Sequence, residues 1–550
     1  MKKIILTVFV ALGVFCCSPA QNQADRIQKQ LSIFNEVMRT LDVNFVDTLN
    51  YEAITRAAIN AMLAHTDPYT IYFPEEKSDI INQMTTGKYA GVGAIIAQIG
   101  DTVYIEYPYY GKPAYTAGLR AGDAILAIDG EKMVGKKNSE VSSRLRGKIG
   151  TPLKIQVKRV GHTRPITMTI TRDEIHMPSV TYSALLDNGM GYILFSDFTE
   201  NSSLEFKHHV EKMASEALGG LKGLIIDLRG NPGGIVGEAA RILSYFIDEG
   251  TTVVVTKRRD EVIRTYKTQQ PPVWRELPLV VLVDEESASA SEIVAGTLQD
   301  LDRAVIIGER TYGKGLVQNV MTIEDGGDLK VTIAKYYIPS GRCIQALDYR
   351  KMTDDGKPYR TPDSLTNEFS TLHGRKVRDG GGIQPDVNIK DENEGGSLAY
   401  SLMQDQQFLF FANHYAAKHN SIAPLKDFEV TDDIMQELLN FLKQRDYKYT
   451  SVSAKYLEDM ERALKFDGIA DSCKAELDAL SAKLNPSLEE AFKIDDYNIR
   501  NALAWELLNR YYPDAGPYAY STKHDNVLLW AIELLNDPEQ MKNILSTKQP

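Results

Sequence analysis

Ser289 stands at a junction that suits a catalytic nucleophile. The apolar run Leu279–Val283 is followed by acidic and small residues up to Ser289, and a helical pattern starts directly after it. A strand that turns into a helix in this way exposes the side chain at the turn, and the first helical amides can stabilise a negatively charged oxygen. The alternative is a plain helix cap, because Ser289 and Glu292 have the spacing of a capping box. Taken alone, capping preferences favour the cap.

A serine nucleophile needs a base, and Lys314 is the best candidate. The nearest histidines in the sequence, His209 and His373, lie in no recognisable catalytic pattern, although the fold could still bring a histidine to the serine. Lys314 is flanked by Gly313 and Gly315, which let the backbone approach closely and exclude water. A lysine accepts a serine proton only in its neutral form, which requires burial to lower a pKa from about 10.4 towards about 7 to 8. The sequence therefore predicts a tightly packed lysine, and the alternative is a surface lysine in a turn.

Two other glycine-containing segments have patterns that could carry a different chemistry or support this one. Residues 308–314 match the first seven positions of a P-loop, but Gly315 stands where Ser or Thr must bind magnesium, and Leu316–Ile323 has the pattern of a strand where a helix is required. These failures argue against a nucleotide site. A second apolar run, Gly223–Leu228, leads into a turn that contains Gly233 and Gly234. Consecutive glycines can aim backbone amides at a developing negative charge, although a plain turn has the same composition.

The composition of the chain limits the classes of partner and cofactor that we expect it to bind. The chain has 550 residues and a net charge of −12, so it lacks the basic face that nucleic-acid binding needs, and we expect no nucleic-acid partner. Only Cys343 and Cys473 follow the N-terminal segment, which is too few for a disulfide framework or a zinc cluster. We expect no metal and no organic cofactor. A single disulfide bridge between these two cysteines stays open.

The N-terminus has the order of a secretory signal peptide. Lys2 and Lys3 precede the apolar run Ile4–Phe15, which is shorter than the about 20 residues that cross a bilayer. We expect residues 1–20 to be removed and the protein to be exported to the bacterial periplasm or cell envelope. Cys16 and Cys17 raise an alternative, lipid attachment with membrane association, but the bulky Phe15 stands where a lipoprotein signal usually carries a small residue.

Hydrophobic spacing divides the remaining chain into four regions. Residues 21–84 have helical spacing, residues 85–175 have short β-type runs separated by glycines, residues 176–390 alternate strands with helices, and residues 391–550 have amphipathic helical spacing. The strands expected in the β-rich region are Ala94–Ile99, Val103–Tyr107, Ala124–Ile128, Leu153–Arg159 and Ile166–Ile170. The fold class predicted is multidomain α/β, with a β-rich domain before the α/β core and helical regions at both ends.

Three segments together resemble the carboxyl-terminal processing, or tail-specific, serine peptidases: Asp227–Gly234, Ser287–Glu292 and Gly313–Gln318. Ser289 and Lys314 are 25 positions apart, and Gln318 follows four residues after the lysine, in agreement with that family. The resemblance implies a core related to the crotonase and Clp-protease folds. It also implies a nucleophile, a base, a supporting glutamine and an oxyanion hole made by the amide of Ala290 with that of either glycine: Ser289, Lys314, Gln318, and Gly233 or Gly234.

Five segments of the β-rich region together resemble a PDZ domain: Tyr89–Ala94, Pro113–Ala114, Ala117–Leu119, Gly122–Asp123 and Ile128–Gly130. Such a domain adds a peptide as a strand to a sheet edge and holds its carboxylate with backbone amides, here expected at Gly91, Val92, Gly93 and Ala94. A purely structural β-module is the alternative. The resemblance to the peptidase family extends through the glycine-rich motif Asp379–Asp386, so it covers roughly residues 30 to 390, and residues 391–550 match no recognised motif. They are expected to form a helical extension for assembly or substrate control.

The resemblance as a whole implies an exported serine endopeptidase that cleaves protein substrates recognised by accessible C-terminal tails. One alternative is a catalytically silent PDZ scaffold that binds peptide tails in the cell envelope. Another is a hydrolase whose PDZ domain captures an activating partner. The sequence leaves open the natural substrate and whether the chain forms a homo-oligomer.

Overall fold

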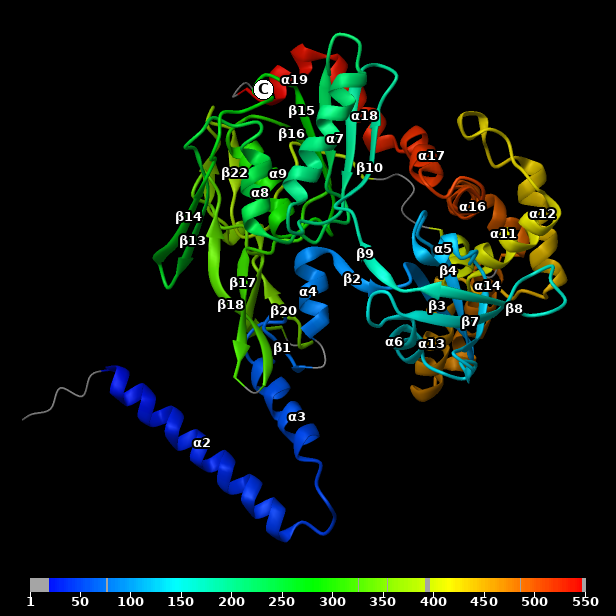
Figure 1. Cartoon of the computed structure of the whole chain (residues 1–550), viewed down its shortest axis with the longest axis horizontal. Helices are drawn as coiled ribbons and strands as arrows, with labels where there is room; N and C mark the ends of the chain where they lie inside the picture. The colour runs from blue at the N-terminus through cyan, green and yellow to red at the C-terminus, as the bar shows by residue number, and fades with distance from the viewer. Residues whose placement is uncertain are drawn as a thin grey trace, which may run out of the picture. The chain divides into compact units, whose positions relative to one another are not determined.

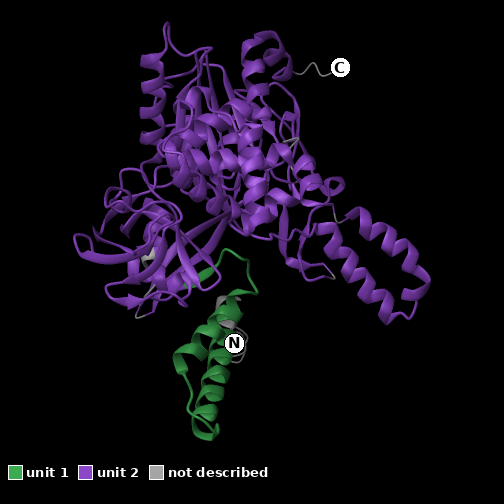
Figure 2. Ribbon diagram, turned by 90° about the vertical axis from the view of Figure 1, so that its right-hand side faces the viewer, with its two compact units in different colours: residues 1–72 green, residues 73–550 purple. Residues whose placement is uncertain are grey.

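The structure is a computed structural model that describes residues 19–75, 78–324, 326–353, 355–390, 396–484 and 486–546. The expected signal peptide up to residue 18, with Cys16 and Cys17, lies outside these ranges. The chain divides into two compact units, residues 1–72 and 73–550, which have different colours in Figure 2. Over the ranges given, the structure contains no helix with the length and apolar character of a membrane span.

The first unit contains two of the helices expected from hydrophobic spacing. These are α2 (Pro19–Asn44) and α3 (Tyr51–Leu63). Asn50 caps α3, because its side-chain oxygen accepts a hydrogen bond from the amide of Ala53 at 2.9 Å. The apolar stripe of α2 stays exposed, with Leu31 at 58% exposure. The helical prediction for this stretch is therefore confirmed, but the stripe of α2 does not form a core.

The β-rich region forms an antiparallel sheet with the strand order β3-β4-β5-β7-β8. Its strands lie within a residue or two of the predicted runs: β3 (Ala94–Ile99), β4 (Thr102–Pro108), β5 (Ala124–Ile128), β7 (Pro152–Lys158) and β8 (Ile166–Thr171). Two short helices, α5 (Pro113–Thr116) and α6 (Asn138–Leu145), accompany it, and β6 (Glu131–Lys132) pairs with β5. A separate ribbon joins β2 (Lys88–Gly91) to β9 (Asp173–His176) at the two ends of the region, after the short helix α4 (Ser78–Thr86).

The α/β core is built on a six-stranded sheet with the order β10-β11-β12-β15-β16-β23. Only the first pair is antiparallel. The strands are β10 (Val180–Leu185), β11 (Met190–Phe195), β12 (Gly223–Asp227), β15 (Leu279–Val283), β16 (Val305–Gly308) and β23 (Val387–Asn388). Central strands β12 and β15 are apolar and fully buried, as expected for parallel strands covered on both faces. The predicted α/β fold class is confirmed.

Helices cover both faces of this sheet. One face packs against α7 (Ser202–Glu216), α8 (Val236–Leu243) and α9 (Ala290–Asp300), which are drawn in green in Figure 1. The other face packs against α18 (Asn526–Asn536) and α19 (Pro538–Ile544), which come from the C-terminal end of the chain. The last part of the sequence therefore completes the core that the middle part begins.

A second, antiparallel sheet lies beyond α8 and α9. It contains β13 (Thr252–Arg258), β14 (Glu261–Lys267), β17 (Leu316–Ile323) and β18 (Gly327–Tyr337), with β18 paired to both β13 and β17. Two small ribbons follow, β19 (Leu347–Met352) with β20 (Pro358–Arg360), and β21 (Glu368–Ser370) with β22 (Lys376–Arg378). Since Leu316–Ile323 is a strand, residues 308–315 do not lead into the helix that a P-loop requires.

The C-terminal region is helical, as predicted. Its helices before α18 are α10 (Ser397–Gln404), α11 (Gln407–Lys418), α12 (Asp432–Gln444), α13 (Val452–Phe466), α14 (Lys474–Leu484), α15 (Leu488–Ile494), α16 (Asp496–Tyr511) and α17 (Gly516–His524). They form a hydrophobic core of their own, to which α10, α11, α12 and α16 contribute most of the buried side chains. Leu438, Leu442 and Leu503, which belong to the amphipathic stripes of this region, are fully buried there.

Candidate active site

Ser289 occupies the turn between β15 and α9. The residue is 7% exposed and has φ 56° and ψ −110°, a backbone conformation that residues other than glycine rarely adopt. The turn is held from several sides. The amide of Ala288 donates to the carbonyl of Asn231 at 3.0 Å, and the hydroxyl of the buried Tyr336 donates to the carbonyl of Ser289 at 3.1 Å. Such a strained, fixed turn is typical of sites where one side chain must be presented in a set direction.

Glu292 separates the catalytic interpretation of Ser289 from the capping interpretation. Its carboxylate accepts a hydrogen bond from the amide of Ser289 at 2.9 Å, which is one half of a capping box. The side chain of Ser289 also has the capping-box placement toward the amide of the third helical residue, but it forms no side-chain cap hydrogen bond there. A typical N-cap also has extended backbone angles, and Ser289 does not. The capping-box placement is therefore present, but the backbone angles and the missing cap hydrogen bond favour the catalytic interpretation.

The same glutamate joins the serine turn to the lysine segment. Glu292 is fully buried, and its Oε2 atom accepts from the amide of Lys314 at 2.8 Å as well as from that of Ser289. The two amide nitrogens therefore lie within about 6 Å of each other, since 2.9 and 2.8 Å separate them from one shared oxygen. The other oxygen, Oε1, accepts from the amide of Gly313 at 2.8 Å and from the hydroxyl of Thr311 at 2.5 Å. Burial raises the pKa of Glu292, and its four donors oppose that rise.

Lys314 is half-buried, and the glycines beside it are tightly packed. Gly313 has φ +88°, and a Cβ atom there would lie 2.4 Å from the Cβ of Ala346. On the other side, the amide of Gly315 donates to the side-chain oxygen of Gln345 at 2.8 Å. Close backbone packing on both sides, as expected from the glycines, sets the position from which the lysine side chain starts.

Gln318 lies on β17, two residues after that strand begins. The pairing of β17 with β18 shifts register between Val317 and Gln318, so that Gln318 is opposite Thr332. Its side-chain amide donates to the hydroxyl of Thr332 at 3.2 Å. The supporting role expected for Gln318 beside the lysine stays a prediction.

Gly233 and Gly234 lie in the turn after β12, directly against the serine turn. A Cβ atom on Gly233 would lie 2.7 Å from the Cβ of Ser289 and 2.8 Å from the nitrogen of Ala290. A Cβ atom on Gly234 would lie 2.4 Å from the carbonyl oxygen of Phe198. Their φ values of +99° and +145° also favour glycine. The structure therefore brings Gly233 against the first amide of α9, while Gly234, next in the same turn, packs against Phe198.

Asn231 holds this turn in shape, a role that the sequence alone did not reveal. Its side-chain amide donates to the carbonyl of Phe195 at 2.6 Å, and its side-chain oxygen accepts from the amide of Gly233 at 2.9 Å. Its backbone carbonyl also accepts from the hydroxyl of Ser291 at 2.9 Å. A polar residue between the arginine and the proline of the turn was the only signal of this role.

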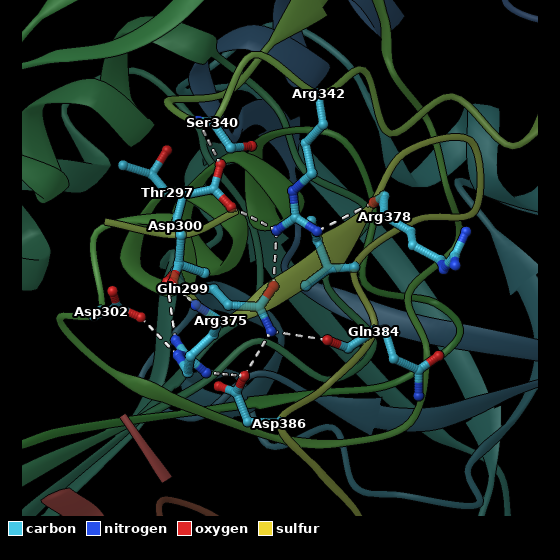
Figure 3. Close-up of polar contacts among 12 residues, drawn as sticks. Thr297, Gln299, Asp300, Asp302, Ser340, Arg342, Arg375, Arg378, Gln384 and Asp386 are labelled. Carbon is cyan, nitrogen blue, oxygen red and sulfur yellow. Dashed lines mark hydrogen bonds and ion pairs between the residues drawn. The ribbon is translucent and has the colours of Figure 1, made fainter. Parts of the chain in front are cut away.

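A buried charged network fixes the opposite end of α9 (Figure 3). Arg342, 1% exposed, forms an ion pair with Asp300 at 2.8 Å and donates to the side-chain oxygen of Gln299 at 2.8 Å. The side-chain amide of Gln299 in turn donates to Asp386 at 2.9 Å, and Asp386 pairs with Arg375 at 2.5 Å. Asp386 belongs to the glycine-rich motif at 379–386, so the motif locks the helix whose first residue follows Ser289.

The other polar candidates are engaged elsewhere. His209 shares a hydrogen bond with the hydroxyl of Ser183 at 2.7 Å, and His373 lies beside Asp302, so these contacts engage both histidines away from Ser289. Cys343 and Cys473 are both free cysteines. The disulfide bridge that the sequence left open is therefore absent from the described residues.

The residues expected to hold a peptide carboxylate lie at the start of the β-rich sheet. Gly91, Val92 and Gly93 are buried, and the carbonyls of Val92 and Gly93 accept from the amides of Ala114 and Tyr109 at 2.8 and 3.0 Å. Gly93 has φ +75°. They lead into β3, which is the terminal strand of its sheet, with α6 beside it. A terminal strand with a neighbouring helix is a geometry to which a peptide strand can be added.

The α/β core with its serine turn, the neighbouring β-rich sheet and the helical region define a serine-type peptidase that carries a PDZ domain. Residues 189–351 match the description "Peptidase family S41", residues 104–159 match "PDZ domain", and residues 398–535 match "Probable PDZ-protease, C-terminal helical domain". The chain belongs to peptidase family S41, among the carboxy-terminal-processing proteases. The resemblance found in the sequence is confirmed, and the C-terminal helices prove to be a domain that other PDZ proteases share.

The relatives that match this chain are named as proteases, or as the PDZ domain of one. A "Carboxy-terminal-processing protease" of Bartonella bacilliformis is 32% identical over 62% of this chain and 80% of its own length. A "Probable CtpA-like serine protease" of Staphylococcus aureus is 33% identical over 81% of this chain and 84% of its own length. Among solved structures, the photosystem II D1 C-terminal processing protease is 27% identical over 66% of this chain and 88% of its own, with a TM-score of 0.36. A PDZ domain of a carboxy-terminal protease from Vibrio cholerae, in complex with peptide, is 28% identical over 16% of this chain and 99% of its own, with a TM-score of 0.16.

Proposed function

We propose that this chain is an exported endopeptidase that cleaves protein substrates with a Ser289/Lys314 dyad. The observation that carries the proposal is the buried carboxylate of Glu292, which accepts hydrogen bonds from the amides of both residues through one oxygen atom. A carboxylate that joins two segments 22 residues apart in the sequence fixes the serine and lysine backbones relative to each other. This is the preorganisation that proton transfer between two side chains needs.

The reaction we assign is acyl transfer. The hydroxyl oxygen of Ser289 attacks the carbonyl carbon of the scissile peptide bond, and neutral Lys314 takes the hydroxyl proton. The tetrahedral intermediate collapses when the C–N bond breaks, and the leaving amine receives the proton from Lys314. Water then hydrolyses the acyl-enzyme, with the lysine again acting first as base. Gln318 follows the lysine by four residues and lies on β17, and we assign it the role of orienting the lysine side chain.

The oxyanion of the intermediate needs two donors, and we assign the amide of Ala290 as one of them. Two glycines are available for the other. The amide of Gly233 already donates to Asn231 at 2.9 Å, which favours Gly234. The close approach of Gly233 to Ser289 supports the assignment of the oxyanion site to this turn, because it places the glycine turn against the nucleophile.

Recognition of the substrate tail is assigned to the PDZ domain. A peptide would add to the free side of β3, with its carboxylate near the amides of residues 91–94. Asn138 of α6 donates to the carbonyl of Ile96 on this strand at 3.3 Å. A peptide strand that bonds to this carbonyl would compete with Asn138, so peptide binding and the position of α6 are expected to be linked.

Export and domain boundaries complete the proposal. The lysines and the apolar run of residues 2–15 support secretion, with lipid attachment at Cys16 or Cys17 as the alternative to release. We propose domains at residues 21–84, 85–175, 176–390 and 391–550.

The test is cleavage of an unfolded model protein by the chain without residues 1–20, compared with Ser289→Ala and Lys314→Ala. We expect both variants to keep the wild-type melting temperature and to lose cleavage. Full activity in either variant would refute the dyad. Peptides with a free or an amidated C-terminus test tail recognition, and equal cleavage of the two would refute it. A wild type that binds such peptides without cleaving them would favour the silent scaffold.

A further inference from the structure

Arg229 links the glycine turn to a distant part of the chain. Its guanidinium donates to the carboxylate of Asp227, with Nε at 2.9 Å, and to the carboxylate of Asp525 at 2.5 Å. Asp227 is 1% exposed and also accepts from the hydroxyl of Tyr192 at 2.8 Å. The side chains of Arg229 and Asp525 are 24% and 19% exposed. The pair is thus largely removed from water, where an ion pair is stronger than at an open surface.

Asp525 belongs to the C-terminal helical region and uses its two oxygens for different purposes. One oxygen caps α18, because it accepts from the amide of Leu528 at 2.9 Å, and the other pairs with Arg229. Helix α18 packs on the sheet face opposite to α9. The C-terminal helical region therefore contacts Arg229, at the start of the glycine turn, through the carboxylate of Asp525, which is fixed at the N-terminus of α18.

The turn that follows Arg229 needs such anchoring. Gly230, Gly233 and Gly234 have φ values of +68°, +99° and +145°, and a segment so rich in glycine has high backbone freedom when it is not held. On the core side, Asp284 accepts from the amide of Gly230 at 2.9 Å, and Asn231 makes the bonds described above. Arg229 with Asp525 restrains the entry of the turn from the opposite side.

We infer that Asp525 is a positioning residue for catalysis, which acts through Arg229 to hold the turn of residues 230–234 at the oxyanion site. The inference rests on the proposed function of that turn. It assigns the C-terminal helical domain a part in positioning the oxyanion site, separate from any part in assembly or substrate capture. Removal of the carboxylate should lower kcat and leave KM almost unchanged, because a residue that positions the oxyanion site acts on the transition state.

The test uses Asp525→Ser in the otherwise complete chain, because serine can still cap α18 but is too short to pair with Arg229. Asp537→Ser is the matched control, since Asp537 caps α19 through the amide of Gln540 in the same way. We expect Asp525→Ser to lower kcat for a model peptide about tenfold, with KM and melting temperature close to those of Asp537→Ser. Equal kcat in the two variants would overturn the inference.

A second variant covers the case in which Asp525→Ser folds poorly. Asn has one side-chain oxygen, so Asp525→Asn keeps the cap of α18 only by turning its NH2 group toward Arg229, and it should lose about as much of kcat as the serine variant. A peptide boronic acid, which mimics the tetrahedral intermediate, should bind more weakly to both variants in proportion to their loss of kcat. Unchanged boronate affinity would also overturn the inference. If Ser289→Ala stays active, the proposed function fails; if it is inactive while Asp525→Ser is fully active, only this inference fails.

Discussion

The substitution Glu292→Gln tests how one buried carboxylate holds the site together. Gln has the same shape as Glu, but one oxygen becomes an NH2 group that can only donate. Placed at the Oε2 position, the NH2 group would face the amides of Ser289 and Lys314, which cannot accept. Placed at Oε1, it would face the amide of Gly313 and the hydroxyl of Thr311, and this hydroxyl can rotate to accept. The second orientation is therefore the less costly one.

The cost of that orientation follows from these contacts. The amide of Gly313 loses its partner inside a fully buried site, which costs about 1 to 3 kcal/mol. The bonds from Ser289 and Lys314 now go to a neutral oxygen and weaken by about 1 kcal/mol each. Together these losses lower the stability of the Glu292→Gln variant by about 3 to 5 kcal/mol. If the displacement of the Ser289 and Lys314 segments raises the activation free energy by about 2 kcal/mol, kcat falls about thirtyfold.

The assay compares kcat for a fluorogenic peptide and the melting temperature of Glu292→Gln with those of Glu238→Gln. Glu238 is also buried, at 2% exposure, and accepts from the amide of Ser203 at 2.9 Å, but it lies on α8 and pairs with Arg241. The control should lose stability and keep kcat. Equal kcat in the two variants would refute the view that Glu292 aligns the serine and the lysine.

Three other predictions address the glycine turn, a raised pKa and the charged network. Gly233→Ala would place a methyl group 2.7 Å from the Cβ of the nucleophile, so activity should fall about a hundredfold, whereas Gly219→Ala, at φ +86° with open space around it, controls for backbone strain. Burial raises the pKa of Asp197 from 3.8 to about 6, so its contribution to stability is present below pH 4 and is lost as the pH rises through 6. Asp197→Asn should therefore raise the melting temperature over that of the wild type at pH 8 but not at pH 4, and an equal difference at both pH values would contradict this. Arg342→Met leaves the carboxylate of Asp300 buried without its partner, which costs about 3 to 5 kcal/mol of stability. Adding Asp300→Asn should restore part of the lost melting temperature, because the unpaired charge is removed. A double variant less stable than Arg342→Met would count against the ion pair.

Local patterns in the sequence determined the elements and the chemistry expected of them. Strand β15 coincides with the predicted run Leu279–Val283, α9 starts directly after Ser289, and β17 coincides with Leu316–Ile323. Such elements can be predicted because buried parallel strands are apolar throughout and helices repeat their apolar residues at three and four. The joint spacing of three motifs also sufficed to identify the family, which the matching relatives confirm.

Only the tertiary structure decided what holds these motifs together. Glu292 has the sequence signature of a capping residue, yet its carboxylate also binds the segment of Lys314, which follows another strand. Asp525 is 296 positions from Arg229, and no local pattern relates the two residues. Hydrogen bonds and ion pairs depend on distances of about 3 Å between atoms, and these distances are set by the packing of helices on both faces of the sheet. Periodicity in the sequence reports which face of an element is buried, but not which distant side chain will meet it there.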